Sequence, residues 1–169
     1  VFAYPVRGVS SPIYHDDFAR EDVMALKEKI SEEMFTNPFE KANLERYEQE
    51  LVGWTKKNRM KLVYDSSQQF FDSKGFNENV CGQKHLLIVV MSGNNIFGSW
   101  HSHPIPKEKK EGFVYIKKDT EHFVFTLQNP HNIPPTRFFP RSVNRSSKSL
   151  CLSGSNSSTC IVGCYSCYF

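Results

Sequence analysis

The sequence predicts an α+β fold, in which a two-helix N-terminal arm is joined to a β-sandwich-like body of antiparallel strands with short helices. Up to Trp54, apolar residues recur at spacings of three and four, which is the period of an α-helix. Beyond Met60 they occur in short β-rich runs separated by turn residues. With 169 residues, of which 39% are hydrophobic, the chain suits one globular body with an appendage. We expect residues 1–53 to form the arm and residues 54–169 the body.

The arm is predicted to begin with an extended segment and a first helix. Prolines and a glycine interrupt residues 1–15, which favours an extended conformation. Asp16 and Asp17 can then cap a helix, because their side-chain oxygens accept hydrogen bonds from the first backbone amides. Apolar residues at helical spacing form one face of this helix, namely Val23, Leu26, Ile30 and Met34.

A second helix is predicted to start directly afterwards. Asn37 can cap it, Pro38 suits the first helical position, and Glu40 lies where a capping-box carboxylate reaches back. Two interpretations of its apolar seam stay open: the seam packs on the body of its own chain, or it forms a homodimer with a second copy. The seam consists of Leu44, Tyr47, Leu51 and Trp54.

The body is predicted to consist of short strands. Residues 86–91 are a fully apolar run of strand length, and the turn at 92–94 leads into a returning strand at 95–99, which makes a hairpin. Residues 130–140 contain four prolines and are predicted to be irregular, and residues 141–158 are predicted to contain a loop rich in Ser and Asn. The further strands are expected at 61–65, 122–127, 149–152 and 159–169.

The order of these signals resembles a known family. A tryptophan near the end of a helix precedes a strand that ends in Tyr-Asp-Ser, a short helix with an aromatic residue, an apolar strand, a turn into Ile-Phe-Gly, and a Phe-rich strand over 123–127. This order is similar to that of TLDc domains of the oxidation-resistance type, over roughly residues 50–169. The residues that carry the resemblance are Trp54, Tyr64, Asp65, Ser66, Phe97 and Gly98.

The resemblance implies structural roles for these motif residues and a non-catalytic function for the domain. That function is protein interaction linked to oxidative-stress protection, in some relatives through the vacuolar proton pump. Asp65 with Ser66 and Ser67 can cap the turn after a strand, and Gly98 allows the close approach of a neighbouring element. Residues 130–158 depart from the family pattern, and its closing strand with an acidic residue is missing, so we expect the C-terminal surface to be altered or truncated.

Charge is distributed unevenly along the chain. Residues 1–50 hold 6 lysines and arginines against 11 aspartates and glutamates, whereas residues 51–169 hold 15 against 7. Nucleic-acid binding requires dense basic residues together with aromatic side chains that stack on bases, such as Trp100, Phe138 and Phe139. A DNA-binding transcriptional regulator that dimerises through the helical seam is therefore the alternative function. Its candidate contacts are Lys107, Lys109, Lys110, Lys117, Lys118, Arg137, Arg141, Arg145 and Lys148.

The sequence His-Ser-His-Pro at residues 101–104 resembles the zinc-binding segment of JAMM isopeptidases. In that class two imidazoles and an aspartate bind a zinc ion that activates water. At the expected distance after the histidines this chain has Val114, and the next aspartate is Asp119. We therefore expect no catalytic residue, and no catalytic metal at His101 and His103. A zinc isopeptidase is the third and disfavoured function.

The cysteines indicate reduced thiols. Their number is five, and an odd set is unusual for a disulfide-framed secreted domain, which favours the cytoplasm or nucleus. The sequence between the last three is apolar and β-like, which favours buried strand cysteines over a zinc site. The alternative that one of these thiols senses the redox state stays open. The four cysteines near the end are Cys151, Cys160, Cys164 and Cys167.

The sequence argues against a membrane-spanning helix and against a nucleotide-binding loop. No segment approaches the roughly 18 consecutive apolar residues that a membrane-spanning helix needs. No phosphate-binding glycine loop is present, and no cofactor is expected. A protein partner is the interaction that the sequence favours.

Overall fold

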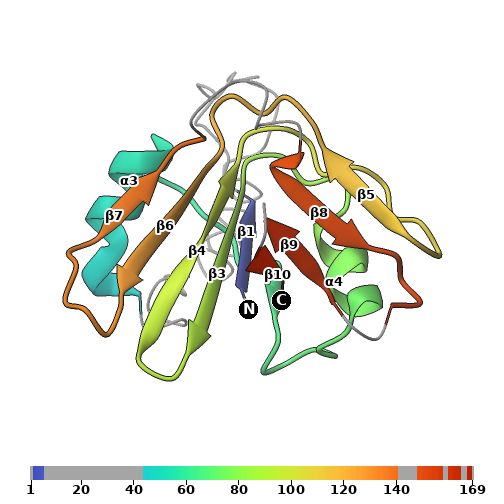
Figure 1. The fold of residues 1–169 in the computed structure, drawn as a ribbon, viewed down its shortest axis with the longest axis horizontal. Helices are drawn as coiled ribbons and strands as arrows, with labels where there is room; N and C mark the ends of the chain where they lie inside the picture. Colours follow the sequence, from blue (N-terminus) through green and yellow to red (C-terminus); the bar gives the residue numbers. More distant parts are fainter. Residues whose placement is uncertain (1, 6–43, 141–147, 158–159, 165–166, 169) are drawn as a thin grey trace, which may run out of the picture.

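The computed structural model describes residues 2–5, 44–140, 148–157, 160–164 and 167–168. These residues form two antiparallel sheets and two short helices, an α+β fold, which confirms the predicted fold class (Figure 1). The helical elements are η1 (Glu45–Tyr47), α3 (Glu48–Thr55) and α4 (Ser73–Val80). The strands are β1 (Phe2–Pro5), β2 (Tyr64–Asp65), β3 (Leu86–Ser92), β4 (Asn95–His101), β5 (Phe113–Ile116), β6 (Phe123–Gln128), β7 (Thr136–Phe138), β8 (Leu150–Ser153), β9 (Val162–Cys164) and β10 (Cys167–Tyr168).

The sheets are built from neighbouring antiparallel pairs. The larger sheet has six strands in the order β2-β1-β3-β4-β6-β7, and the smaller has four in the order β10-β9-β8-β5. The predicted hairpin forms its centre, where β3 and β4 pair from Leu86 with His101 to Ser92 with Asn95. The short β1 lies between β2 and β3, so the extended N-terminal segment contributes a strand to the sheet.

Strand β3 separates two apolar cores, which explains why its sequence is apolar without alternation. Leu87 and Val89 face the helix-side core, whereas Leu86 and Ile88 face the intersheet core. The helix-side core also contains Leu44, Leu51, Ile96, Trp100, Phe123, Phe125 and Leu127. The intersheet core also contains Tyr64, Phe76, Val80, Ile105, Ile116, Leu150, Leu152, Ile161 and Val162.

The helical seam packs on the body of its own chain. Leu44 and Leu51 are fully buried in the helix-side core, and Tyr47 and Trp54 are partly buried against it. The first interpretation of the seam therefore describes this chain, and its two leucines have no exposed surface to offer a second copy. The predicted first helix from Asp16 to Met34 lies outside the described residues, as do the cap residues from Asn37 to Glu40.

Two predictions need correction, and one strand was missed. Residues 130–140 are not wholly irregular, because β7 pairs with β6 at the edge of the large sheet, where the flanking prolines interrupt no internal ladder. The strand expected at 61–65 is reduced to β2. Strand β5, which pairs with β8, was not predicted, because the lysines around it obscure its apolar pattern.

The described residues contain no helix with the length and apolar character that crossing a membrane requires.

Candidate functional site

The family-motif residues at the start of the body shape a turn. Asp65 is buried at the end of β2, and its Oδ1 accepts hydrogen bonds from the backbone amide of Ser67 at 2.9 Å and from its hydroxyl at 2.7 Å. The Tyr64 ring packs edge-on against Phe76 of α4 at 5.0 Å between ring centroids, and its hydroxyl donates to the Phe70 carbonyl at 3.0 Å. Through these contacts Asp65 caps the turn that follows β2.

Gly98 is required by a close approach of backbone. A Cβ atom built at this position would overlap the carbonyl oxygen of Ile88 on β3 and would lie 2.7 Å from Cζ of Phe125 on β6. The register between β4 and β6 also shifts between Ile96 and Phe97, directly before this glycine. Gly98 therefore lies where the neighbouring strand backbone comes too close for a side chain.

An open pocket of about 460 Å³ lies beside the C-terminal end of α3. The indole of Trp54 forms part of its wall and contacts the rings of Phe123 and Phe125 at centroid distances of 6.2 and 5.8 Å. The pocket therefore combines an aromatic wall from the helix-side core with access from solvent. Its lining residues are Trp54, Thr55, Lys56, Lys57, His85, Trp100, Thr120, Glu121, Phe123, Arg137 and Phe139.

Arg137 connects the pocket wall to the helix. Its guanidinium lies 5.0 Å from the centre of the Phe139 ring and 5.7 Å from that of Phe123, which are cation–π distances. Its Nη1 donates a hydrogen bond to the carbonyl of Trp54 at 3.3 Å, in the last turn of α3, where a positive charge is favourable. The predicted nucleic-acid contact Arg137 is thus part of an aromatic pocket.

The other predicted basic contacts lie around a different strand. Lysines flank β5 at both ends, and the ammonium of Lys148 lies 5.0 Å from the centre of the Tyr115 ring on that strand. Because β5 ends the small sheet while β7 ends the large one, Arg137 is separate from these lysines (Figure 1). The lysines flanking β5 are Lys107, Lys109, Lys110, Lys117 and Lys118, and the predicted contacts Arg141 and Arg145 lie outside the described residues.

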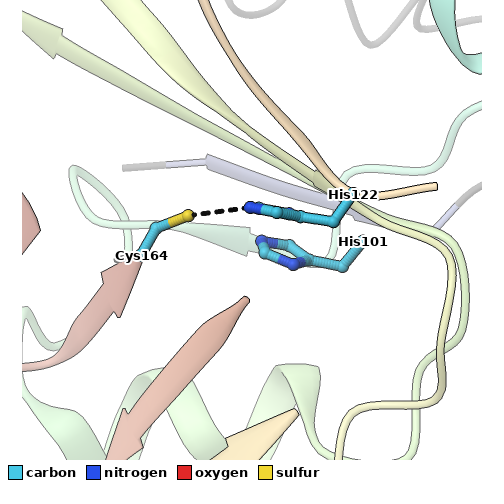
Figure 2. A group of neighbouring side chains, drawn as sticks. All are labelled: His101, His122 and Cys164. Atoms are coloured by element: carbon cyan, nitrogen blue, oxygen red, sulfur yellow. Dashed lines mark hydrogen bonds between the residues drawn. The ribbon is translucent and has the colours of Figure 1, made fainter. Parts of the chain in front are cut away.

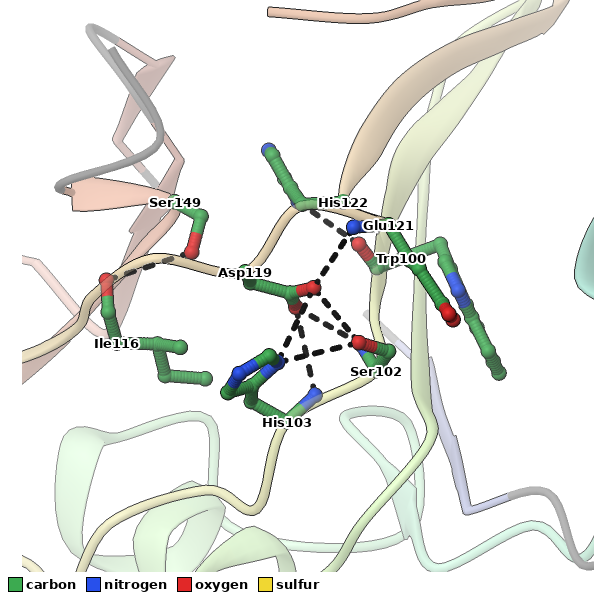
Figure 3. A network of polar contacts seen from close by, with 8 residues as sticks. All are labelled: Trp100, Ser102, His103, Ile116, Asp119, Glu121, His122 and Ser149. Carbon is green, nitrogen blue, oxygen red and sulfur yellow. Dashed lines mark hydrogen bonds and ion pairs between the residues drawn. The ribbon is translucent and has the colours of Figure 1, made fainter. Parts of the chain in front are cut away.

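The two histidines of His-Ser-His-Pro have separate surroundings. Figure 3 shows Asp119, which is fully buried, binding the turn after β4: it accepts hydrogen bonds from the Ser102 hydroxyl at 2.7 Å and the Ser102 amide at 2.8 Å. His103 remains half-exposed, with its Nδ1 3.3 Å from Oδ1 of Asp119. Asp119 therefore orders this turn, and His101 points elsewhere.

His101 lies with His122 and Cys164 in the interior (Figure 2). The three residues are buried, and one potential ligand atom from each lies within 4.8 Å of the others. The imidazoles stack with their centroids 4.7 Å apart, and Sγ of Cys164 is 3.4 Å from Nε2 of His122. Among the described residues this group has the ligand types of a metal site.

The interior keeps both imidazoles neutral. Burial lowers the pKa of His101 well below its usual value, and the neighbouring His122 lowers it further. Burial also lowers the pKa of His122, against smaller opposite effects of the Trp100 carbonyl and Asp119. Neutral imidazole is the form that binds metal ions.

Sequence reasoning did not bring these three residues together. His122 precedes β6 and Cys164 ends β9, so no short spacing connects them with His101. The expectation of buried strand cysteines agrees with the burial of Cys151 and Cys164, but it is wrong for Cys160, which is only partly buried and precedes β9. The side chain of Cys167 lies outside the described part. The three residues come together only where the two sheets pack against each other.

Comparison with known families matches residues 36–168 to the TLDc domain. The match begins before α3 and runs through residues 130–158, which the sequence analysis set apart from the family pattern. No curated protein and no solved structure matches the chain. Because the family match covers most of the 169 residues, the chain belongs to the TLDc domain family.

Proposed function

We propose that this TLDc domain is a non-catalytic protein-interaction domain linked to oxidative-stress protection, and that it acts in the cytoplasm or nucleus. The family is the basis for the stress-related role. The observation that carries the interaction role is the open aromatic pocket beside α3. Interface centres are enriched in aromatic residues and arginine, which this pocket combines in Trp54, Phe139 and Arg137.

The charges around the pocket favour an acidic partner segment. The pocket lining contains three cationic side chains and one carboxylate, that of Glu121. The cationic residues are Lys56, Lys57 and Arg137. Phe139 is about half-exposed, so it can still lose solvent-accessible apolar surface when a partner binds. We infer that the partner presents an apolar side chain next to aspartate or glutamate, since such a segment complements both features.

A non-catalytic role is supported by the contacts of Asp119 and of the two histidines in His-Ser-His-Pro. Asp119, the first aspartate after His-Ser-His-Pro, accepts hydrogen bonds from the backbone of the turn. His103 lies beside Asp119 whereas His101 is directed to His122 and Cys164. The two histidines of the motif are therefore not arranged around one open zinc position in the described part of the chain.

The test uses the full chain as bait in native extract, with and without nuclease, and compares it with Phe139→Ala and Lys57→Glu. Phe113→Ala is the matched control, because Phe113 is similarly exposed but lies on β5, away from the pocket. We expect one protein partner that survives nuclease treatment, is retained by Phe113→Ala and is lost with both pocket variants.

Two results would contradict the proposal. Loss of every partner after nuclease treatment would favour the DNA-binding alternative. Equal partner recovery with all variants would show that the pocket is not the contact. A direct link to stress is measured separately, as survival of peroxide-treated cells that express the wild type or Phe139→Ala, where the variant should protect less.

A further inference from the structure

The buried group of His101, His122 and Cys164 joins the two sheets. His101 ends β4, and His122 directly precedes β6 in the same six-stranded sheet. Cys164 ends β9 in the four-stranded sheet, and Figure 2 shows its sulfur directed toward the imidazoles. The potential ligand atoms lie within 4.8 Å of one another, so small side-chain adjustments bring them to the distances of a shared metal ion.

His101 has an unsatisfied ring nitrogen. Its Nε2 lies 2.8 Å from the Ser99 hydroxyl, but its Nδ1 has no hydrogen-bond partner although the residue is completely buried. A buried polar atom without a hydrogen-bond partner destabilises the folded state. Coordination of this nitrogen by an ion would remove that cost, which is a reason to consider the imidazole a ligand.

His122 is oriented as a metal-ligating histidine usually is. Its Nδ1 lies 2.7 Å from the Trp100 carbonyl, which can only accept, so Nδ1 carries the proton and the lone pair of Nε2 faces Cys164. In metal sites the second imidazole nitrogen commonly donates to a backbone carbonyl in this way, which fixes the tautomer.

Cys164 has one thiol proton and two nearby acceptors. Its Sγ lies 3.1 Å from the Ser149 carbonyl and 3.4 Å from Nε2 of His122. A single S–H cannot satisfy both acceptors at full strength. Binding of a metal ion would release that proton to solvent and form one bond from the thiolate and one from the Nε2 lone pair.

We propose that His101, His122 and Cys164 bind a thiophilic metal ion, zinc(II) or copper(I), that fastens the small sheet to the large one. Two imidazoles and a thiolate select these soft or borderline ions over magnesium and calcium, which prefer oxygen ligands. The described residues supply three ligands, which suits copper(I) directly and leaves the fourth position of zinc to a water molecule. We assign the ion a structural role, because the group is buried and its residues come from both sheets.

The experiment measures metal binding by the full chain, produced without a histidine tag and stripped with chelator. Cobalt(II) serves as the spectroscopic probe for the zinc arm, because a thiolate ligand gives an intense ultraviolet charge-transfer band and tetrahedral geometry gives visible absorption. Copper(I) is titrated anaerobically in the second arm against a chromophoric competitor. Elemental analysis gives the stoichiometry, and thermal unfolding with and without metal reports stabilisation.

Three variants locate the site. Cys164→Ser should abolish the thiolate band and lower the affinity by at least about a hundredfold, as expected from the loss of a direct ligand. Cys151→Ser removes another buried thiol on the neighbouring strand β8, and His103→Gln removes the exposed histidine beside Asp119. Both controls should keep one ion per chain and the full band.

The wild-type measurement decides the matter even if Cys164→Ser does not fold. One bound ion, the thiolate band and a metal-dependent protection of Cys164 from alkylation, which chelation reverses in peptide mass spectrometry, support the proposal, and the favoured arm identifies the ion. Folded wild-type chain that shows no thiolate band with cobalt and no stoichiometric copper(I) overturns it. Unchanged binding by folded Cys164→Ser, or loss of binding with Cys151→Ser, overturns it as well.

Discussion

His101 and His103 are two residues apart, yet they lie in different environments. His101 is completely buried beside His122, whereas His103 is 45% exposed and contacts Asp119. The reason is local: Asp119 binds the amides of Ser102 and His103 and turns the chain at the end of β4. A short motif can therefore resemble a zinc protease while its two imidazoles face different parts of the molecule.

Gly98 provides a residue-scale prediction. Gly98→Ala places a Cβ against the Ile88 carbonyl, so β3 and β4 must separate, and we expect a destabilisation of about 1–3 kcal/mol. Denaturant unfolding of both proteins measures this difference. Gly53→Ala is the control, because a Cβ at Gly53 meets nothing within 4 Å and should stabilise the α3 helix by about 0.5–1 kcal/mol. A Gly98→Ala chain as stable as wild type would show that the strands accommodate the methyl group.

At the scale of elements, α3 is held by its seam rather than by its own caps. Its N-cap residue Tyr47 makes no side-chain capping hydrogen bond, and with eight residues it is too short to be stable alone. Burial of Leu44 and Leu51 against β3, β4 and β6 supplies the stabilisation. The helix in turn contributes Trp54 to the wall of the open pocket.

This packing predicts the outcome of seam substitutions. Leu51→Ala should destabilise the chain by about 2–5 kcal/mol, because it leaves a cavity in the helix-side core. Gln49→Ala, at an exposed position of the same helix, should change stability by less than about 0.5 kcal/mol. Thermal unfolding tests both, and sedimentation should give the same mass for all three proteins. A wild-type dimer that Leu51→Ala dissociates would instead support the homodimer interpretation.

On the scale of the whole molecule, two groups of basic residues stand out in the described part of the chain. Lysines surround β5 at the edge of the small sheet, whereas Arg137, Lys56 and Lys57 line the pocket beside α3. The lysines on the approach to β5 are interspersed with Glu108 and Glu111, which reduces the local positive potential. This arrangement favours weak, salt-sensitive attraction to anions over a continuous nucleic-acid track.

Duplex DNA binding measured across salt concentrations tests that view. We expect only weak binding that is indifferent to sequence at physiological salt. Neutralising Lys109 and Lys110 should make its salt slope shallower by up to about 0.9 per lost phosphate contact. Adding neutral substitutions at Arg141 and Arg145 tests the remaining predicted contacts. Binding to one sequence at least about a thousandfold tighter than to a scrambled duplex would make the DNA-binding regulator the leading function.

The sequence by itself determined the fold class, the family and most strands of the body. Alternation and apolar runs were sufficient to predict β3, β4 and β6, because the sequence pattern of each strand reflects whether one or both of its faces are buried. The motif around Asp65 and the glycine at position 98 were also readable, because a capping turn and a close backbone approach require particular residue types.

Only the tertiary structure decided which residues meet across the sheets. Pairing of β7 with β6 brings Arg137 and Phe139 to Trp54, and the packing of β9 against the large sheet brings Cys164 to His101 and His122. Local periodicity reports the burial of a residue but not the identity of its distant neighbours. The open pocket and the candidate metal site depend on such contacts between residues far apart in the chain, and for that reason neither could be derived from the sequence alone.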